Sequence, residues 1–132
     1  ILYENLERFE EAFSMLKMSS DKGNPNAQFL YGMRKEFGIN TPIDLTEANI
    51  YYKKSAIQGN EDASYRLAVN LLHGNGVEKN EKEAMTYLKI SAELGNKDAM
   101  ILYAANLKDG VGIDPDPVLA EKYMKSAFGL KD

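Results

Sequence analysis

The chain has 132 residues, of which 44% are hydrophobic, so it is long and apolar enough to bury one continuous core as a single domain. Its formal net charge is −4, with 16 basic and 20 acidic residues mixed along the sequence and no Lys/Arg-rich run, which argues against a nucleic-acid partner. No apolar stretch approaches the roughly 18 residues that membrane insertion requires, and the absence of cysteine excludes disulfides and thiolate metal sites and favours a reducing compartment such as the cytoplasm.

The chain opens at Ile1 in mid-pattern and without a secretory signal, so we expect a fragment of a longer protein. The first predicted helix spans residues 7–22 and stands alone. After it, helices are predicted in pairs over residues 24–37 and 44–58, 60–73 and 80–94, and 96–109 and 116–128. The connection between one pair and the next is about two residues long, which predicts antiparallel neighbours. The sequence therefore predicts an all-α fold.

Identical residues recur at intervals of 36 positions, and no insertion or deletion is needed between Ala12 and Lys125. The recurring sets are Ala12, Ala48, Ala84 and Ala120; Gly23, Gly59 and Gly95; Asn24, Asn60 and Asn96; and Ala27, Ala63 and Ala99. A fixed period of about 20 to 50 residues is typical of stacked units that cannot bury their apolar faces alone. We therefore predict one repeat domain over residues 1–132, with units at about 1–23 (partial), 24–59, 60–95 and 96–132.

Residues with strong end preferences stand at the predicted helix boundaries. The glycine of each Gly-Asn pair is expected to end a helix in a left-handed C′ conformation, and the asparagine is expected to cap the next helix. Candidate N-caps of the second helices are Asp44, Asn80 and Asp116. Glu47 and Glu83 follow two of them by three residues, which predicts capping boxes.

Within the second helices, small and large residues alternate at helical spacing. Ala48, Tyr52 and Ala56 define a face that Ala84, Leu88 and Ala92 repeat. Such a pattern suits close helix crossing, with the larger side chain filling the space beside the smaller one. The tyrosines at positions 51, 87 and 123 recur beside this face, so we assign them to packing rather than to a ligand-stacking ladder.

The segment from Ala63 to Asn96 carries three further motifs. They are Leu67-Ala68, the loop Gly74-Asn-Gly76-Val77, and Ser91-Ala92-Glu93-Leu94-Gly95. With these motifs the chain resembles the Sel1-like repeat, a relative of the tetratricopeptide repeat with a longer unit, over residues 9–128. Gly110-Val-Gly112-Ile113 repeats the loop. Gly38-Ile-Asn40-Thr41 keeps only its first glycine, and Lys35 replaces the apolar residue found at Leu71 and Leu107.

The resemblance implies a right-handed α-solenoid of antiparallel helix pairs, with the first helix of each pair on the concave face. It also implies an adaptor that assembles protein complexes. Because the repeated residues serve packing and turns, we expect no catalytic activity, and we expect no cofactor. The expected function is therefore a non-enzymatic protein–protein interaction module that binds a protein or peptide. The alternative is a structural or regulatory array attached to a catalytic domain, such as a kinase or ubiquitin ligase, in a longer protein.

Several residues suggest chemistry but lack the partners that the chemistry needs. Ser14 and Lys17 match the Ser-x-x-Lys of serine β-lactamases, but the Ser-Asp-Asn and Lys-Thr-Gly motifs that accompany it are missing. His73 is the single histidine and has no cysteine beside it, so neither a zinc site nor a nucleophile pair can be assembled. We expect His73 to complement a helix C-terminus.

Two further motifs have a structural interpretation. Asp109, Asp114 and Asp116 do not have the spacing of an EF-hand loop, so we expect no metal site there. The Gly-x-Gly loops follow helices rather than strands, which is the wrong context for phosphate binding.

A row of variable side chains on the first helices is the candidate partner-binding surface of the concave face. We call it the first-helix row, and its members are Phe29, Met33, Glu36, Tyr65, Val69, Leu72, His73, Ile101 and Lys108. Aromatic residues and methionine in a groove are typical of peptide recognition. Phe29, Tyr65 and Ile101 could equally pack between units, and the sequence alone favours neither role.

The ends of the chain carry exposed apolar residues in this scheme. Ile1, Leu2, Leu6 and Phe9 precede the first complete pair, and Phe128 and Leu130 follow the last helix. Because the terminal units of a solenoid lack a neighbour on one side, these residues either cap the ends or mediate end-to-end self-association.

Overall fold

The computed structural model describes the backbone of residues 2–131 and the side chains of residues 6–131. This part of the chain forms seven α-helices and contains no strand. The helices are α1 (Leu2–Asp21), α2 (Pro25–Phe37), α3 (Leu45–Ile57), α4 (Glu61–His73), α5 (Glu81–Glu93), α6 (Lys97–Asp109) and α7 (Pro117–Ala127). Every predicted helix is confirmed, and the bounds of α2 to α7 agree with prediction to within one residue. The first helix begins at Leu2 rather than at residue 7.

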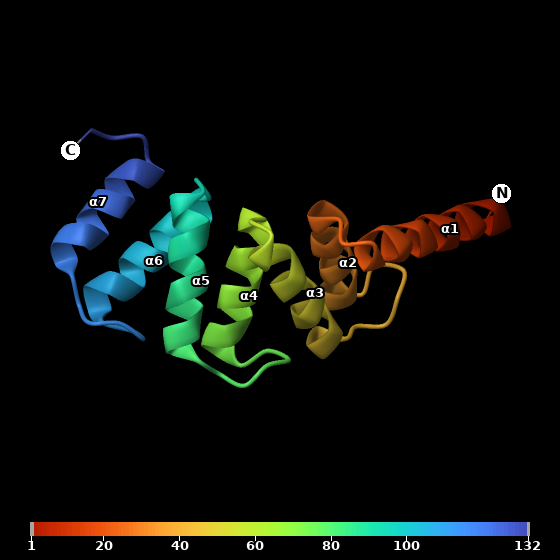
Figure 1. Ribbon diagram of the computed structural model, residues 1–132, viewed down its shortest axis with the longest axis horizontal. Coiled ribbons are helices and arrows are strands. Elements are labelled where there is room, and N and C mark those ends of the chain that lie inside the picture. The colour runs from red at the N-terminus through yellow and green to blue at the C-terminus, as the bar shows by residue number, and fades with distance from the viewer. Residues whose placement is uncertain (1, 132) are drawn as a thin grey trace.

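The main contacts between helices join consecutive elements, from α1 with α2 through to α6 with α7. Figure 1 shows the helices following one another along the long axis, with the two termini at opposite ends. Contacts limited to neighbours are the hallmark of a repeat array, in which each unit is stabilised by the next. The helical repeat architecture predicted from the 36-residue period is confirmed.

Asparagine caps all three first helices, as predicted. The Oδ1 atoms of Asn24, Asn60 and Asn96 accept hydrogen bonds from the backbone N–H three residues later, at 3.0, 2.9 and 2.8 Å. The glycines that precede these asparagines have φ values of 96°, 95° and 100°, so they are the left-handed residues that end the preceding helices.

The amide nitrogen of two of these caps has a second role. Asn60 Nδ2 donates to Asn26 Oδ1 at 3.2 Å, and Asn96 Nδ2 donates to Asp62 Oδ1 at 3.1 Å. Each bond joins the start of one first helix to the start of the previous one. Asparagine therefore caps its own helix and links it to the neighbouring unit, which an ionised aspartate could not do because it has no donor.

The capping boxes predicted at the second helices form only halfway. Asp44 and Asn80 accept from the N–H groups of Glu47 and Glu83 at 3.0 Å each. The reciprocal bond is missing because the N–H of each cap donates instead to a carbonyl of the preceding helix, Lys35 or Leu71, at 2.8 and 2.9 Å. The same backbone bond is present at α7, where the N–H of the cap residue Asp116 donates to the carbonyl of Leu107 at 2.9 Å. The helix pair is thus joined at this end through the backbone.

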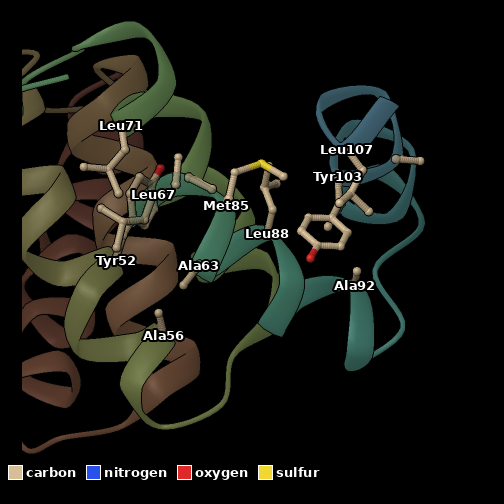
Figure 2. Close-up of a cluster of buried hydrophobic side chains, with 14 of the residues drawn as sticks. Tyr52, Ala56, Ala63, Leu67, Leu71, Met85, Leu88, Ala92, Tyr103 and Leu107 are labelled. Carbon is tan, nitrogen blue, oxygen red and sulfur yellow. The ribbon is translucent and has the colours of Figure 1, made fainter. Parts of the chain in front are cut away.

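The core runs along the array between the two layers of helices. Small and large residues of the second helices alternate in it as predicted, and Figure 2 shows part of this cluster. Tyr52 and Leu88 are fully buried at equivalent positions. A Cβ atom on Gly32 would lie 2.6 Å from the Tyr52 ring, whereas Ala68 stands at the equivalent position beside Leu88. The larger ring is thus matched by the smaller neighbour.

Lys35 is accommodated at an otherwise apolar position. Its Nζ atom lies 3.1 Å from Thr41 Oγ1 and 3.5 Å from Glu47 Oε2. It also lies 5.8 and 5.7 Å from the ring centroids of Phe13 and Tyr31, which stack on each other. A charge that is largely removed from water needs such partners. The first unit therefore differs from the later ones by a local polar cluster.

The second glycine of the Gly-x-Gly loop packs against the previous unit. A Cβ on Gly76 would lie 2.6 Å from the carbonyl carbon of Leu45, and one on Gly112 would lie 2.4 Å from the carbonyl oxygen of Glu81. Both contacts are with the first residue of the preceding second helix. Asn40 replaces this glycine in the first loop, keeps a left-handed φ of 60°, and is exposed.

The N-terminal half of α1 departs from the repeat. Ala12 is exposed, although its equivalents Ala48 and Ala84 are fully buried. Residues 6–12 are all exposed, and Figure 1 shows this half of the helix projecting from the body. No earlier helix in the described residues covers this face, which is why the 36-residue pattern here does not produce burial.

Candidate functional site

The first-helix row lies on α2, α4 and α6, and its members differ in exposure. His73, Ile101 and Lys108 are exposed, whereas Tyr65 and Val69 are half-buried. Phe29, Met33 and Leu72 are half-buried because they pack against the hydrophobic core. The part of the row that reaches solvent therefore lies mainly on α4 and α6.

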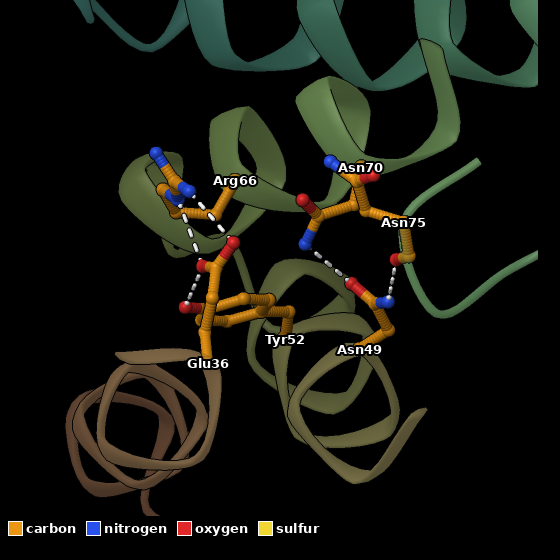
Figure 3. Close-up of polar contacts among 6 residues, drawn as sticks. All are labelled: Glu36, Asn49, Tyr52, Arg66, Asn70 and Asn75. Carbon is orange, nitrogen blue, oxygen red and sulfur yellow. Dashed lines mark hydrogen bonds and ion pairs between the residues drawn. The ribbon is translucent and has the colours of Figure 1, made fainter. Parts of the chain in front are cut away.

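Glu36 is not available to a partner in the way that the sequence indicated. Its side chain is buried, and its carboxylate accepts from the Tyr52 hydroxyl at 2.6 Å. It also accepts two hydrogen bonds from Arg66, from Nε at 3.1 Å and from Nη2 at 2.7 Å (Figure 3). A buried carboxylate needs such a set of donors to remain charged. Glu36 is thus a positioning residue for Arg66 on the next unit.

Arg66 is the residue that the sequence interpretation missed. Its guanidinium is held by Glu36 from one side and lies 5.2 Å from the centroid of the Phe37 ring. Phe37 itself is 51% exposed. Burial opposes ionisation of Arg66, but the hydrogen bonds and the charge of Glu36 outweigh it and raise the arginine pKa. Arg66 and Phe37 therefore form a fixed, charged and partly exposed group beside Tyr65.

A comparison between units could have identified this ion pair. The positions of Glu36 and Arg66 correspond to Leu72 and Leu102 one unit later. Both leucines are half-buried and pack against the core. The same junction is therefore closed by an ion pair between the first and second complete units and by two leucines between the second and third. The sequence signal for the ion pair is a charged residue where the next unit has leucine, followed 30 residues later by a residue of opposite charge.

A second polar contact distinguishes the same two junctions. Asn70 Nδ2 donates to Asn49 Oδ1, and Asn49 Nδ2 donates to the carbonyl of Asn75 in the loop, both at 2.8 Å (Figure 3). One unit later Met85 replaces Asn49, and the buried Nδ2 of Asn106 has no hydrogen-bond partner among the described residues. The polar network therefore closes only one junction.

Burial also raises the pKa of the core tyrosines. The Tyr52 pKa lies above its ordinary value because the hydroxyl is removed from water and donates to Glu36. Burial and the bond to Asp21, at 2.9 Å, raise the pKa of Tyr51 to about 12. These phenols are neutral donors at physiological pH, which suits a structural role and not acid–base catalysis.

The other residues considered for chemistry are spread over α1, α4 and the start of α7. Ser14 and Lys17 are exposed on α1, and His73 is the exposed last residue of α4. Asp116 is the N-cap of α7, as predicted, and accepts from the N–H of Leu119 at 3.0 Å. Among the described residues, no three His, Cys, Asp or Glu side chains are close enough to hold a metal ion. None of the helices described here is both long and apolar enough to cross a membrane.

A large open cavity lies away from the first-helix row. It has a volume of about 980 Å³ and is open to solvent between α5 and the loop that joins α6 to α7. Met85, Tyr103 and Gly112 contribute to its wall. It lies at the junction where Met85 replaces Asn49, and its charged side chains have both signs.

Comparison with known proteins agrees with the repeat architecture. The family model described as Sel1 repeat matches residues 25–60, 61–96 and 97–131. No curated protein sequence matches the chain. The fold alone is shared with Helicobacter pylori cysteine rich protein B, which is 15% identical with a TM-score of 0.72, over 96% of this chain and 91% of that one.

Two solved structures are more similar in sequence, each with 27% identity. One is a protective antigen of uropathogenic Escherichia coli strains with an SLR fold, matched with a TM-score of 0.86 over 89% of this chain and 25% of that one. The other is a Sel1 repeat protein from Oxalobacter formigenes, matched with a TM-score of 0.88 over 99% and 54%. The chain thus spans about a quarter and about half of these two proteins.

The three family matches follow one another without a gap from residue 25 to residue 131. Sel1 repeats are non-catalytic, and proteins that contain them are generally protein-interaction modules. The three matches, the uninterrupted helix pairs and the structural neighbours all agree, and the chain belongs to the Sel1 repeat family.

Proposed function

We propose that the chain binds a peptide or protein segment along the first helices α2, α4 and α6, on the concave face expected of the array. The support is the set of aromatic and apolar side chains that remain accessible at repeated positions on these helices. They are Phe37, Tyr65, Val69 and Ile101. Aromatic side chains are enriched in known protein interfaces, and the buried centre of an interface is more apolar than the rest of the surface.

The observation that carries the proposal is the anchored arginine. Glu36 accepts hydrogen bonds from two of the three guanidinium nitrogens of Arg66. Figure 3 shows the third nitrogen turned away from Glu36. An arginine already fixed in place loses little conformational freedom when it binds an acceptor. Phe37 beneath it adds apolar surface. The favoured partner is a segment with an apolar side chain beside a carbonyl or carboxylate acceptor.

The shape of the surface favours a segment over a small molecule. Small-molecule sites are concave and enclose most of the ligand. The open cavity of about 980 Å³ lies beside α5, and no member of the first-helix row lines it. An elongated surface on three successive helices matches an extended or helical peptide better.

A peptide-library selection followed by affinity measurement tests the proposal. A peptide selected on the parent chain should bind a Tyr65→Ala/Ile101→Ala variant at least tenfold more weakly, because two accessible anchors are removed. The matched control is Ile50→Ala/Ile57→Ala, which removes two exposed apolar side chains from α3. The control should bind like the parent. If the Tyr65→Ala/Ile101→Ala variant binds the peptide like the parent and the control variant loses affinity, the binding site lies on the second helices instead.

A further inference from the structure

An apolar groove lies between the second helices α3 and α5, within the array rather than at either end. Its volume is about 580 Å³. Both helices pack mainly against the first helices beside them and not against each other, so space remains between them. Three large apolar side chains of its wall reach solvent, since Ile57 is 72% exposed, Leu94 48% and Ile90 39%. Accessible apolar side chains that adjoin one another are characteristic of protein-interaction sites.

Polar side chains join the two walls of the equivalent groove one unit earlier, between α1 and α3. The Tyr51 hydroxyl donates to Asp21 at 2.9 Å, and the Nζ atom of Lys54 lies 4.8 Å from the centroid of the Tyr51 ring. The residues at the same positions between α3 and α5 are Ile57, Tyr87 and Ile90. Isoleucine has neither an acceptor nor a charge, so the α3–α5 groove lacks this polar link.

The groove one unit later, between α5 and α7, again has an acidic residue at the position of Asp21. Burial raises the pKa of Tyr123 there, and the negative charge of this residue, Glu93, raises it further. Isoleucine at position 57 is therefore a feature of one groove and not of the repeat. Because most of the Ile57 side chain is in water, burial in the core does not account for its apolar character.

Charge at the α3–α5 groove favours a basic group. Both helices end here, because Ile57 is the last residue of α3 and Glu93 is the last residue of α5. A helix C-terminus carries partial negative charge, and the last turn of α5 holds no basic residue that would offset it. Among the described residues that line the groove, Glu93 is the single charged one.

The lysines of α3 and α5 line other depressions. Lys54 lies over Tyr51 in the groove beside α1, and Lys82 and Lys89 line the cavity on the other side of α5, to which Glu93 also contributes. Lys53 lines a separate depression toward the start of α5. The other charged residues of that depression are Glu78, Lys79 and Glu83. The α3–α5 groove itself therefore combines apolar walls with one carboxylate at its edge.

We propose that this groove binds an amphipathic helix of a partner protein. The helix inserts two apolar side chains one turn apart beside Ile57 and Ile90, and it pairs a lysine or arginine with Glu93. Helices associate by packing the ridges of one into the grooves of another, and a helical segment in an apolar groove is an established mode of peptide recognition. The inference does not depend on partner binding along the first helices, because no member of the first-helix row lines this groove.

A library of amphipathic helical peptides, with leucine fixed along one face and lysine, glutamate or glutamine varied beside it, provides the probe. The library is selected on the Tyr65→Ala/Ile101→Ala variant, so that the first helices do not decide which peptides are recovered. The affinity of the tightest peptide is then measured for the same chain with the groove altered. Ile57→Asp/Ile90→Lys introduces the residue types found at Asp21 and Lys54, so the fold should be kept, which circular dichroism verifies.

Ile57→Asp/Ile90→Lys should weaken binding at least tenfold, because the apolar walls are lost. The matched control is Thr46→Asp/Ile50→Lys, which introduces the same two charges at exposed positions of α3 outside the groove and should leave the affinity unchanged. If the groove variant loses helicity, Ile57→Gln replaces it, since this position is largely exposed.

A second variant tests the charge. Glu93→Gln should weaken binding of a lysine-bearing peptide about threefold, and it should have no effect once that lysine is replaced by glutamine.

Three results would overturn the proposal. They are recovery of no helical peptide that distinguishes the groove variant from its control, selected peptides that carry glutamate rather than lysine beside the leucines, and lysine-bearing peptides that bind equally well after Glu93→Gln. Absence of partner binding along the first helices would change none of these measurements, so the two proposals fail separately.

Discussion

At the scale of single residues, the most informative choice is asparagine at the start of every first helix. The side-chain oxygen caps the helix, while the nitrogen of Asn60 or Asn96 bonds to the previous first helix. The acceptor differs between the two, being the amide of Asn26 in one case and the carboxylate of Asp62 in the other.

This difference predicts unequal effects of one substitution at two equivalent positions. Asn96→Asp retains the cap but places a second carboxylate beside Asp62. Asn60→Asp also retains the cap, and its carboxylate faces the side-chain amide of Asn26, which can rotate and donate a hydrogen bond to it. We expect Asn96→Asp to lower the free energy of unfolding by about 1 kcal/mol more than Asn60→Asp at low salt. Urea denaturation of both variants measures this, and added salt should narrow the gap. Equal midpoints at low salt would show that the bond between units is not formed.

The buried Tyr51 hydroxyl predicts a specific alkaline transition. Its folded pKa is raised to about 12, first by burial and then by the bond to Asp21. The unfolded pKa is about 10, so this contribution to stability is complete below pH 10 and is lost as the pH rises through about 12. The difference in phenolate absorbance between the parent and Tyr51→Phe isolates this group. A midpoint near 12 supports the assignment, and a midpoint near 10 contradicts it.

At the scale of helix pairs, equivalent junctions are closed by different chemistry. Glu36 and Arg66 form an ion pair where the next junction has Leu72 and Leu102. Breaking such a pair leaves a charge buried, whereas replacing the whole network with apolar residues is often neutral.

We therefore expect Arg66→Leu alone to cost about 2 kcal/mol, because the Glu36 carboxylate keeps only the Tyr52 hydroxyl. A Glu36→Leu/Arg66→Leu/Tyr52→Phe variant copies the apolar junction without an unpaired hydroxyl, and its stability should return to within about 1 kcal/mol of the parent. Chemical denaturation compares the three chains. A triple variant less stable than Arg66→Leu would mean that the junctions are not interchangeable.

The same contrast explains what could be predicted from the sequence. Helix bounds and N-caps were predictable because capping depends on residues within one turn, as at Asn24 and Asp116. The capping box at Glu47 forms only halfway, because the backbone N–H of Asp44 donates to the carbonyl of Lys35 on another helix. The burial of Glu36 could not be read from its own helix, since Arg66 lies 30 residues away. Contacts between units depend on how helices stack, which local patterns do not encode.

At the scale of the whole molecule, the array presents an elongated surface along its first helices. The accessible residues of α2, α4 and α6 are proposed to receive a partner.

The most direct test of partner binding along the first helices is a backbone-amide chemical-shift titration with a selected peptide. We expect the largest shifts at Phe37, Tyr65, Arg66 and Ile101, with small shifts along the exposed faces of α3 and α5. Largest shifts along α3 or α5, or around the cavity wall at Gly112, with the first helices unchanged, would contradict partner binding on this face.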